Sequence, residues 1–168
     1  MNKQWFWGTI VLIVLLAAGF IVVQKPGLNT PSNNPTNDNA SVVNNSLDLS
    51  NKGLTQLPRY VLQMTNLEKL DLSNNQLTGA LPAEIRQLKN LKILDMSDNL
   101  MTGIPAEIGQ LSNLQVLDLS NNKFTGLPYE LGNLKKLQIL NLSGNQYAQA
   151  DLEVIRRGLP ASVNIITD

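Results

Sequence analysis

One aspartate position recurs along the chain and is the most regular group in it that could do chemistry. Its members, at intervals of 23, 24 and 23 residues, are Asp48, Asp71, Asp95 and Asp118, and Asn141 takes the same place one unit later. A row of carboxylates can attract a cationic partner or divalent ions, and a carboxylate pair perturbed by burial can act as acid and base. The structural alternative is that short polar side chains keep a strand surface solvated. We favour this alternative, because the aspartates are expected to face water with no partner base.

The rest of the composition excludes most catalytic and metal chemistry. The chain has no cysteine and no histidine, which removes thiol nucleophiles, disulfides, histidine-based triads and nearly all zinc sites. It contains no glycine-rich phosphate loop followed by Lys and Ser or Thr. Basic and acidic residues number 13 each, so nothing points to a nucleic-acid partner. We therefore predict that the protein is not an enzyme and has no cofactor, no metal site and no nucleic-acid partner.

Two further columns flank the aspartates in the sequence. The preceding column is Lys69, Ile93, Val116 and Ile139, and the following one is Ser50, Ser73, Ser97, Ser120 and Ser143. The alternation in LDLS places Leu70 and Leu72 on one side of a short strand and Asp71 on the other. Stacked strands would form a parallel sheet, with the leucines inside and all three columns on the open face. The β-branched stripe is either a small apolar contact patch or a set of strand-stabilising residues.

The units that carry these columns repeat with a fixed length. Leu67, Leu91, Leu114 and Leu137 lie 24, 23 and 23 residues apart, and a partial unit begins at Leu47. Such self-similarity is typical of stacked units that cannot bury their apolar side alone. The pattern L-x-x-L-x-L-x-x-N-x-L, followed by L/I-P-x-x-I/L-x-x-L, resembles the leucine-rich repeat family from Leu47 to the C-terminus. Three Thr-Gly pairs, the first at Thr78, add a feature of the extracellular plant-type subclass.

The resemblance implies an α/β solenoid, a horseshoe with short parallel strands on its concave face and short helices or 3₁₀ turns on its convex face. It implies that the aligned Asn75, Asn99, Asn122 and Asn145 satisfy turn backbone inside the coils, with Lys52 as the one departure. It also implies that ligands bind the concave face. The predicted binding residues there are Asp48, Lys69, Asp71, Ser73, Ile93, Asp95, Ser97, Val116, Asp118, Ser120, Ile139 and Asn141.

Helix and cap signals complete the repeat domain, predicted over residues 46–168. Pro58, Pro82, Pro105 and Pro128 suit the first turn of the outer helices. A C-terminal cap is predicted from about residue 149, with Asp151 as N-cap of a helix that Gly158 and Pro160 end, followed by a strand over 163–166. Val42 and Val43 are candidates to cover the first coil. Phe124 and Tyr147 are expected in the core, and Tyr60 and Tyr129 on the outer side.

An apolar run over residues 5–23 precedes the repeats. Its 19 helical residues would span about 28 Å, close to the ~30 Å core of a bilayer. This length favours an uncleaved transmembrane signal anchor over a signal peptide cleaved near Gly19. Lys3 lies before the run, so the positive-inside rule predicts a short cytoplasmic N-terminus, residues 1–4, and an extracytoplasmic repeat domain. Residues 24–45, rich in Asn, Pro, Ser and Thr, are predicted to be a disordered linker with ends about 25 Å apart.

These features predict a single-pass cell-membrane protein whose repeat domain binds a protein or cell-surface ligand without catalysis. Two alternatives keep the solenoid but change its use. One is a secreted effector or adhesin released by signal cleavage. The other is a structural spacer that self-associates edge to edge.

Overall fold

The fold is a stack of five coils, which we describe for residues 41–168 of a computed structural model, with backbone only for residues 41–43. The coils begin at Leu47, Leu67, Leu91, Leu114 and Leu137. The predicted segments 1–4 and 5–23, and the linker up to residue 40, lie outside the described residues. Within residues 41–168, no helix is long and apolar enough to cross a bilayer.

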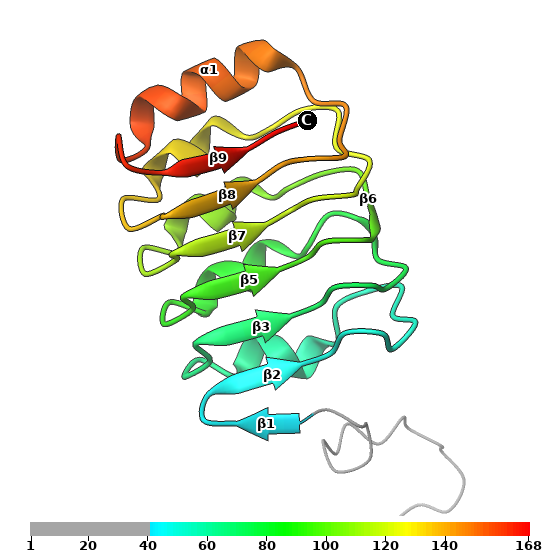
Figure 1. The fold of residues 1–168 in the computed structure, drawn as a ribbon. Coiled ribbons are helices and arrows are strands. Elements are labelled where there is room, and N and C mark those ends of the chain that lie inside the picture. Colours follow the sequence, from blue (N-terminus) through cyan, green and yellow to red (C-terminus); the bar gives the residue numbers. More distant parts are fainter. Residues whose placement is uncertain (1–40) are drawn as a thin grey trace, which may run out of the picture. The chain divides into compact units, whose positions relative to one another are not determined.

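Each of the five coils contributes one strand to a seven-stranded sheet on one side of the stack, and one further strand extends the sheet at each end. Its order is β1 (Ser41–Val43), β2 (Ser46–Asp48), β3 (Lys69–Asp71), β5 (Ile93–Asp95), β7 (Val116–Asp118), β8 (Ile139–Asn141) and β9 (Asn164–Ile166). All pairs from β2 to β9 are parallel, whereas β1 runs antiparallel to β2 (Figure 1). The sheet therefore begins at Ser41, five residues before the predicted domain boundary, and β1 covers the first coil where the Val42-Val43 pair suggested.

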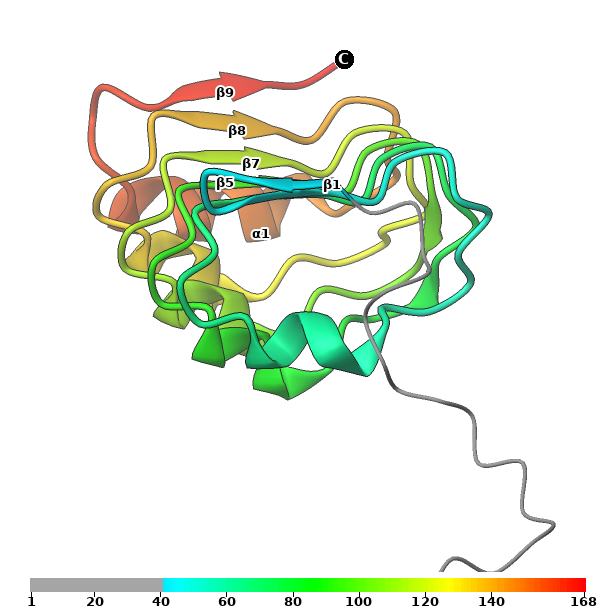
Figure 2. The ribbon, with the colours of Figure 1, turned by 90° about the horizontal axis from the view of Figure 1, so that it is seen from below.

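Short 3₁₀ helices line the opposite side of the stack (Figure 2). They are η1 (Arg59–Gln63), η2 (Ala83–Gln87), η3 (Ala106–Gln110) and η4 (Tyr129–Asn133). A proline precedes each helix at its N-cap, one position earlier than expected, with the extended ψ of 130–147° that leads into a helical turn. The convex side is thus built from 3₁₀ turns in every coil except the last.

The coil interior is a continuous leucine core. The middle strand position is fully buried in every coil that carries it, as at Leu47, Leu70, Leu94, Leu117 and Leu140. At least one apolar residue of each 3₁₀ helix is buried in the same core, and Phe124 replaces a leucine at 0% exposure. The predicted burial of Phe124 is confirmed, while Tyr147 is only partly buried against this core.

A ladder of buried asparagines joins successive coils. The Asn99 side chain donates to the carbonyls of Leu72, Met96 and Ser97, and its Oδ1 accepts the N–H of Leu77 at 3.0 Å. Each asparagine thus serves its own turn and the turn of the preceding coil. This geometry explains the departure at Lys52. Lys52 lies in the first coil, so there is no turn of an earlier repeat coil for an asparagine at this position to bind. The N–H of Lys52 itself donates to the Asn75 side chain of the next coil.

In the second coil, the segment that leads from the strand to the 3₁₀ helix carries one extra residue. Seven positions separate Asn75 from Pro82, against six between Asn99 and Pro105. Here β4 (Thr78–Gly79) pairs with β6 (Leu100–Met101) of the third coil in a second, two-stranded parallel sheet. Gly79 has φ +68°, which suits glycine and lets the chain bulge at Ala80.

The last coil ends in the one α-helix of residues 41–168, α1 (Gln149–Gly158), which packs on η4. The prediction that Asp151 is its N-cap is wrong, because α1 begins three residues earlier than expected and Ala148 is the N-cap. The Asp151 carboxylate instead accepts the N–H of Leu127 from the preceding coil at 3.2 Å. The predicted helix end at Gly158 and the final strand, β9, are confirmed.

Candidate binding surface

The open face of the large sheet carries the residues predicted to bind a ligand. Strand register stacks Lys69, Ile93, Val116 and Ile139 in one column and Asp71, Asp95, Asp118 and Asn141 in the next. Lys69 and Ile139 are exposed, and Ile93 and Val116 are half-buried. The strand-lined face therefore presents a β-branched stripe that is beside a row of carboxylates, as the alternation predicts.

Each aspartate of that row is tied to a serine two residues later. The Oγ of Ser97 donates to Asp95 Oδ1 at 2.7 Å, and the Ser97 N–H donates to the same oxygen at 2.9 Å. Asp71 and Asp118 bind Ser73 and Ser120 in the same way. One carboxylate oxygen of each is therefore used to close the turn after the strand. This contact supports the structural interpretation of the aspartate row.

The three central residues of the serine column are not part of the accessible face, contrary to expectation. Ser73, Ser97 and Ser120 are buried, with 6–8% of their surfaces exposed. The prediction extended the strand alternation too far. Each strand ends at the aspartate. The serine therefore lies in the turn that follows, bonded to the aspartate and just before a left-handed residue such as Asn74 or Asp98.

Asp48, the exposed residue at the start of the aspartate row, is charged. At Asp48, the hydrogen bonds from the Ser50 N–H and hydroxyl, helped by Lys52 and Lys69, hold the pKa of the carboxyl below its ordinary value despite slight desolvation. Asp48 is consequently ionised at neutral pH. Within residues 41–168, no set of three or more carboxylates lies close enough to hold a metal ion.

The repeat geometry agrees with the comparison to protein families. A model described as a leucine-rich repeat region matches residues 45–153. The chain belongs to the leucine-rich repeat family. The predicted resemblance is therefore confirmed.

Solved structures of leucine-rich repeat proteins share the fold. A leucine-rich repeat protein of Leptospira interrogans is 45% identical over 66% of this chain and 28% of its own length, with a TM-score of 0.61. The ectodomain of the Arabidopsis thaliana receptor kinase SOBIR1 is 31% identical over 72% of this chain and 66% of its own, with a TM-score of 0.58. The plant peptide hormone receptor RGFR1, in complex with RGF2, is 36% identical over 73% of this chain and 24% of its own, with a TM-score of 0.60. The chain thus covers less than two thirds of each of these relatives. No curated protein sequence gave a match.

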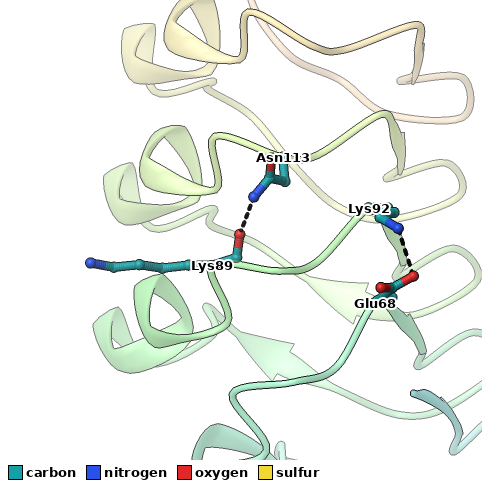
Figure 3. A network of polar contacts seen from close by, with 4 residues as sticks. All are labelled: Glu68, Lys89, Lys92 and Asn113. Atoms are coloured by element: carbon teal, nitrogen blue, oxygen red, sulfur yellow. Dashed lines mark hydrogen bonds and ion pairs between the residues drawn. The ribbon is translucent and has the colours of Figure 1, made fainter. Parts of the chain in front are cut away.

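A polar ladder on one edge of the leucine-rich repeat stack was missed in the sequence. Lys92 Nζ lies 2.7 Å from Glu68 Oε2, and Asn113 Nδ2 donates to the Lys89 carbonyl at 2.8 Å (Figure 3). Lys136 extends the ladder to Asn113 Oδ1 at 2.8 Å. The signal was present, because Asn90 and Asn113 recur one repeat apart. These contacts are exposed, so they align neighbouring coils at small energetic gain.

The tyrosines differ in exposure. Tyr129 on η4 is 58% exposed, whereas Tyr60 on η1 is half-buried against the core. Tyr147 in the last coil is also half-buried. Burial and the nearby Asp168 carboxylate raise the pKa of its phenol above the ordinary value of 10.0.

The raised pKa of Tyr147 predicts a loss of stability in alkali. The unfolded chain releases the phenol proton near pH 10, before the folded chain does, so the contribution is present below that pH and falls as pH rises through the folded pKa. We expect Tyr147→Phe to lose less unfolding free energy than the wild type between about pH 8 and about pH 11 in urea titrations. Tyr129→Phe is the control. Equal losses in the wild type and Tyr147→Phe would contradict the prediction.

Proposed function

We propose that this protein is a non-catalytic binding module, tethered to a membrane and facing away from the cytoplasm, that recognises a protein or cell-envelope ligand. The observation that carries the proposal is the strand-lined face, where Ile93, Val116 and Ile139 form an accessible β-branched stripe opposite the leucine core. An apolar stripe with polar borders is typical of an interaction surface.

The negative charges beside the stripe indicate which kind of ligand would fit this face. Asp71, Asp95 and Asp118 flank it, each with one carboxylate oxygen that its serine partner leaves unused, although Asn141 also donates to Asp118 Oδ2 at 3.0 Å. Lys69 is the only basic residue in the two accessible columns. An extended segment that alternates apolar and basic side chains would match this face.

The relatives support a protein ligand. RGFR1 was solved in complex with RGF2, and SOBIR1 was solved as the ectodomain of a receptor kinase. These are properties of those proteins. They support, for this chain, a receptor-like use of the repeat domain on the outer side of a membrane.

The ligand-binding proposal predicts a position-dependent crosslink. A photoreactive amino acid placed at Val116 in the full chain on intact cells should yield a discrete crosslinked product, and the same group at Glu107 on η3 should not. Adding Ile139→Asp should abolish the product, because a charge in the stripe must be desolvated on binding. The matched control is Val154→Asp on α1, because Val154 is also an exposed β-branched residue but lies off the sheet. A product that survives Ile139→Asp, or that forms equally from position 107, would refute a role for this face.

The membrane part of the proposal has a separate test. Protease added to intact cells should remove the repeat domain from the membrane fraction while a cytoplasmic marker stays intact. Protection until lysis would reverse the orientation. Recovery of the domain in the medium, with a mature N-terminus near Gly19 by mass, would favour the secreted alternative, and concentration-dependent oligomers would favour the structural one.

A further inference from the structure

A hollow of about 480 Å³ lies between the first two coils, away from the strand-lined face. It is on the side of the stack where β6 is labelled in Figure 1. Its size falls within the ~300–1,000 Å³ of typical ligand pockets. The wall is apolar and buried, and is formed by Leu57, Leu77, Leu81 and Met101. Gln56, Arg59 and Thr78 add polar groups at exposed positions.

The extra residue of the second coil accounts for the hollow. The first two coils stay hydrogen-bonded as far as the Thr78 N–H, which donates to the Thr55 carbonyl at 3.3 Å. Beyond it, Ala80 leans toward the third coil, where a Cβ on Gly103 would lie 3.5 Å from the Ala80 Cβ. The chains of the first and second coils therefore diverge between Thr78 and Pro82.

Three backbone donors lie at the hollow. Among the hydrogen bonds of residues 41–168, none uses the N–H of Leu57, Ala80 or Leu81, and all three residues line the hollow. Leu57 and Leu81 are buried, whereas Ala80 is exposed. A buried N–H without a partner is unfavourable, so the N–H groups of Leu57 and Leu81 favour a ligand that carries an acceptor.

The fourth coil shows which acceptor fits this position. Leu57 and Leu127 are equivalent, since each immediately precedes the proline before a 3₁₀ helix. The Leu127 N–H donates to the carboxylate of Asp151, which comes from the following coil. At Leu57 the following coil bulges away and supplies no such group. A carboxylate from outside would restore the contact seen at Leu127.

Arg59 adds the matching charge. It lies two residues after Leu57, lines the hollow and takes no part in the two ion pairs of residues 41–168. Glu84 lines a neighbouring hollow with Arg59 but is not ion-paired to it. An arginine suits a carboxylate because its planar guanidinium can donate two parallel hydrogen bonds.

We propose that this hollow binds the C-terminal end of a peptide whose last residue is apolar. The carboxylate would bind the Leu57 N–H and Arg59, the side chain would pack on Leu77 and Met101, and peptide carbonyls would use the remaining donors. A peptide matches the site better than a simple acid, because Ala80, Leu81 and Gln56 offer donors beyond those that one carboxylate needs. This site is independent of the strand-lined face, so either proposal can fail without the other.

The test uses the full chain in lipid nanodiscs and the tripeptide Gly-Ala-Leu, labelled at its N-terminus, as free acid or as C-terminal amide. We expect the acid to bind about tenfold more tightly than the amide by fluorescence anisotropy, and Arg59→Gln to weaken the acid about tenfold. Deletion of Ala80, which restores the shorter coil, should abolish binding, while Arg86→Gln on η2 should leave it unchanged. Unlabelled acid should shift the Leu57 amide signal in NMR spectra.

Three results with the tripeptide would overturn the proposal. They are no binding of the acid, equal binding of acid and amide, and an Arg59→Gln variant that binds as the wild type does. The simple acid 4-methylpentanoate has the same apolar end without the peptide. If it binds as tightly as Gly-Ala-Leu, the site recognises small acids and the peptide assignment is wrong. Ile139→Asp should leave peptide binding unchanged, which separates this site from the strand-lined face.

Discussion

Replacing Asn99 with alanine is expected to lower the free energy of unfolding by about 3–5 kcal/mol, because several buried backbone groups lose their partner at once. Asn99 is 5% exposed, donates to the carbonyls of Leu72, Met96 and Ser97 and accepts the Leu77 N–H. Two successive coils depend on these contacts. The measurement is urea unfolding followed by circular dichroism.

Asn113 provides the matched control for this substitution. Its side-chain amide also donates to a carbonyl of the preceding coil, that of Lys89, but it does so at the exposed edge (Figure 3). Water can replace that bond, so Asn113→Ala should cost no more than about 1 kcal/mol. Similar losses at positions 99 and 113 would mean that the buried ladder is not a main source of stability.

Replacing Gly109 with alanine is expected to destabilise the stack by about 2–4 kcal/mol through steric overlap. A Cβ at this position would lie 2.2 Å from the Glu130 carbonyl oxygen and 2.8 Å from its carbon. These are backbone atoms of η4, so no side-chain rotation relieves the contact. The 3₁₀ helices η3 and η4 would have to separate, and the same urea titration measures the cost.

Gly103→Ala is the control, because a Cβ there would meet only the Ala80 Cβ at an ordinary 3.5 Å. Its backbone has no left-handed strain, so the substitution should change the unfolding free energy by no more than about 0.5 kcal/mol. If Gly109→Ala were as mild as Gly103→Ala, the close approach of η3 and η4 would not be a constraint on the sequence.

The sequence was sufficient to predict the repeating parts of the fold. A leucine position that recurs in every coil, as at Leu70 and Leu94, can be buried only by stacking, so sheet order and core follow from the repeat. The aligned asparagines were also predictable in type and place. The reason why lysine replaces asparagine at position 52 was not predictable. It depends on which coil's backbone each asparagine binds, and that is visible only when the coils are stacked.

Local signals failed where tertiary contacts decided the outcome. Asp151 is a good N-cap residue, yet its carboxylate is used by Leu127 of the preceding coil, and α1 begins earlier. Ser97 continues the strand alternation in the sequence, yet it lies in the turn before the left-handed Asp98 and is buried. In both cases, the competing contact lies in a neighbouring coil or in a left-handed turn that simple periodicity does not encode.

The candidate binding surfaces were predicted only in part. Strand alternation correctly placed Ile93, Val116 and Ile139 on the open face. The hollow beside Leu57 was not predicted, because it arises from a difference between two repeats. The signal is the single extra residue between Asn75 and Pro82, and comparison of repeat lengths would have pointed to that coil.

Contacts between the helices and strands of this stack run only between neighbouring coils. If the two ends of the domain were drawn apart, the load would pass through each coil boundary in series. An end coil has only one neighbour, so it would detach first, and each detached coil of 23 residues would release about 80 Å of chain. A domain built in this way can lengthen in steps while the coils that remain stacked keep their shape.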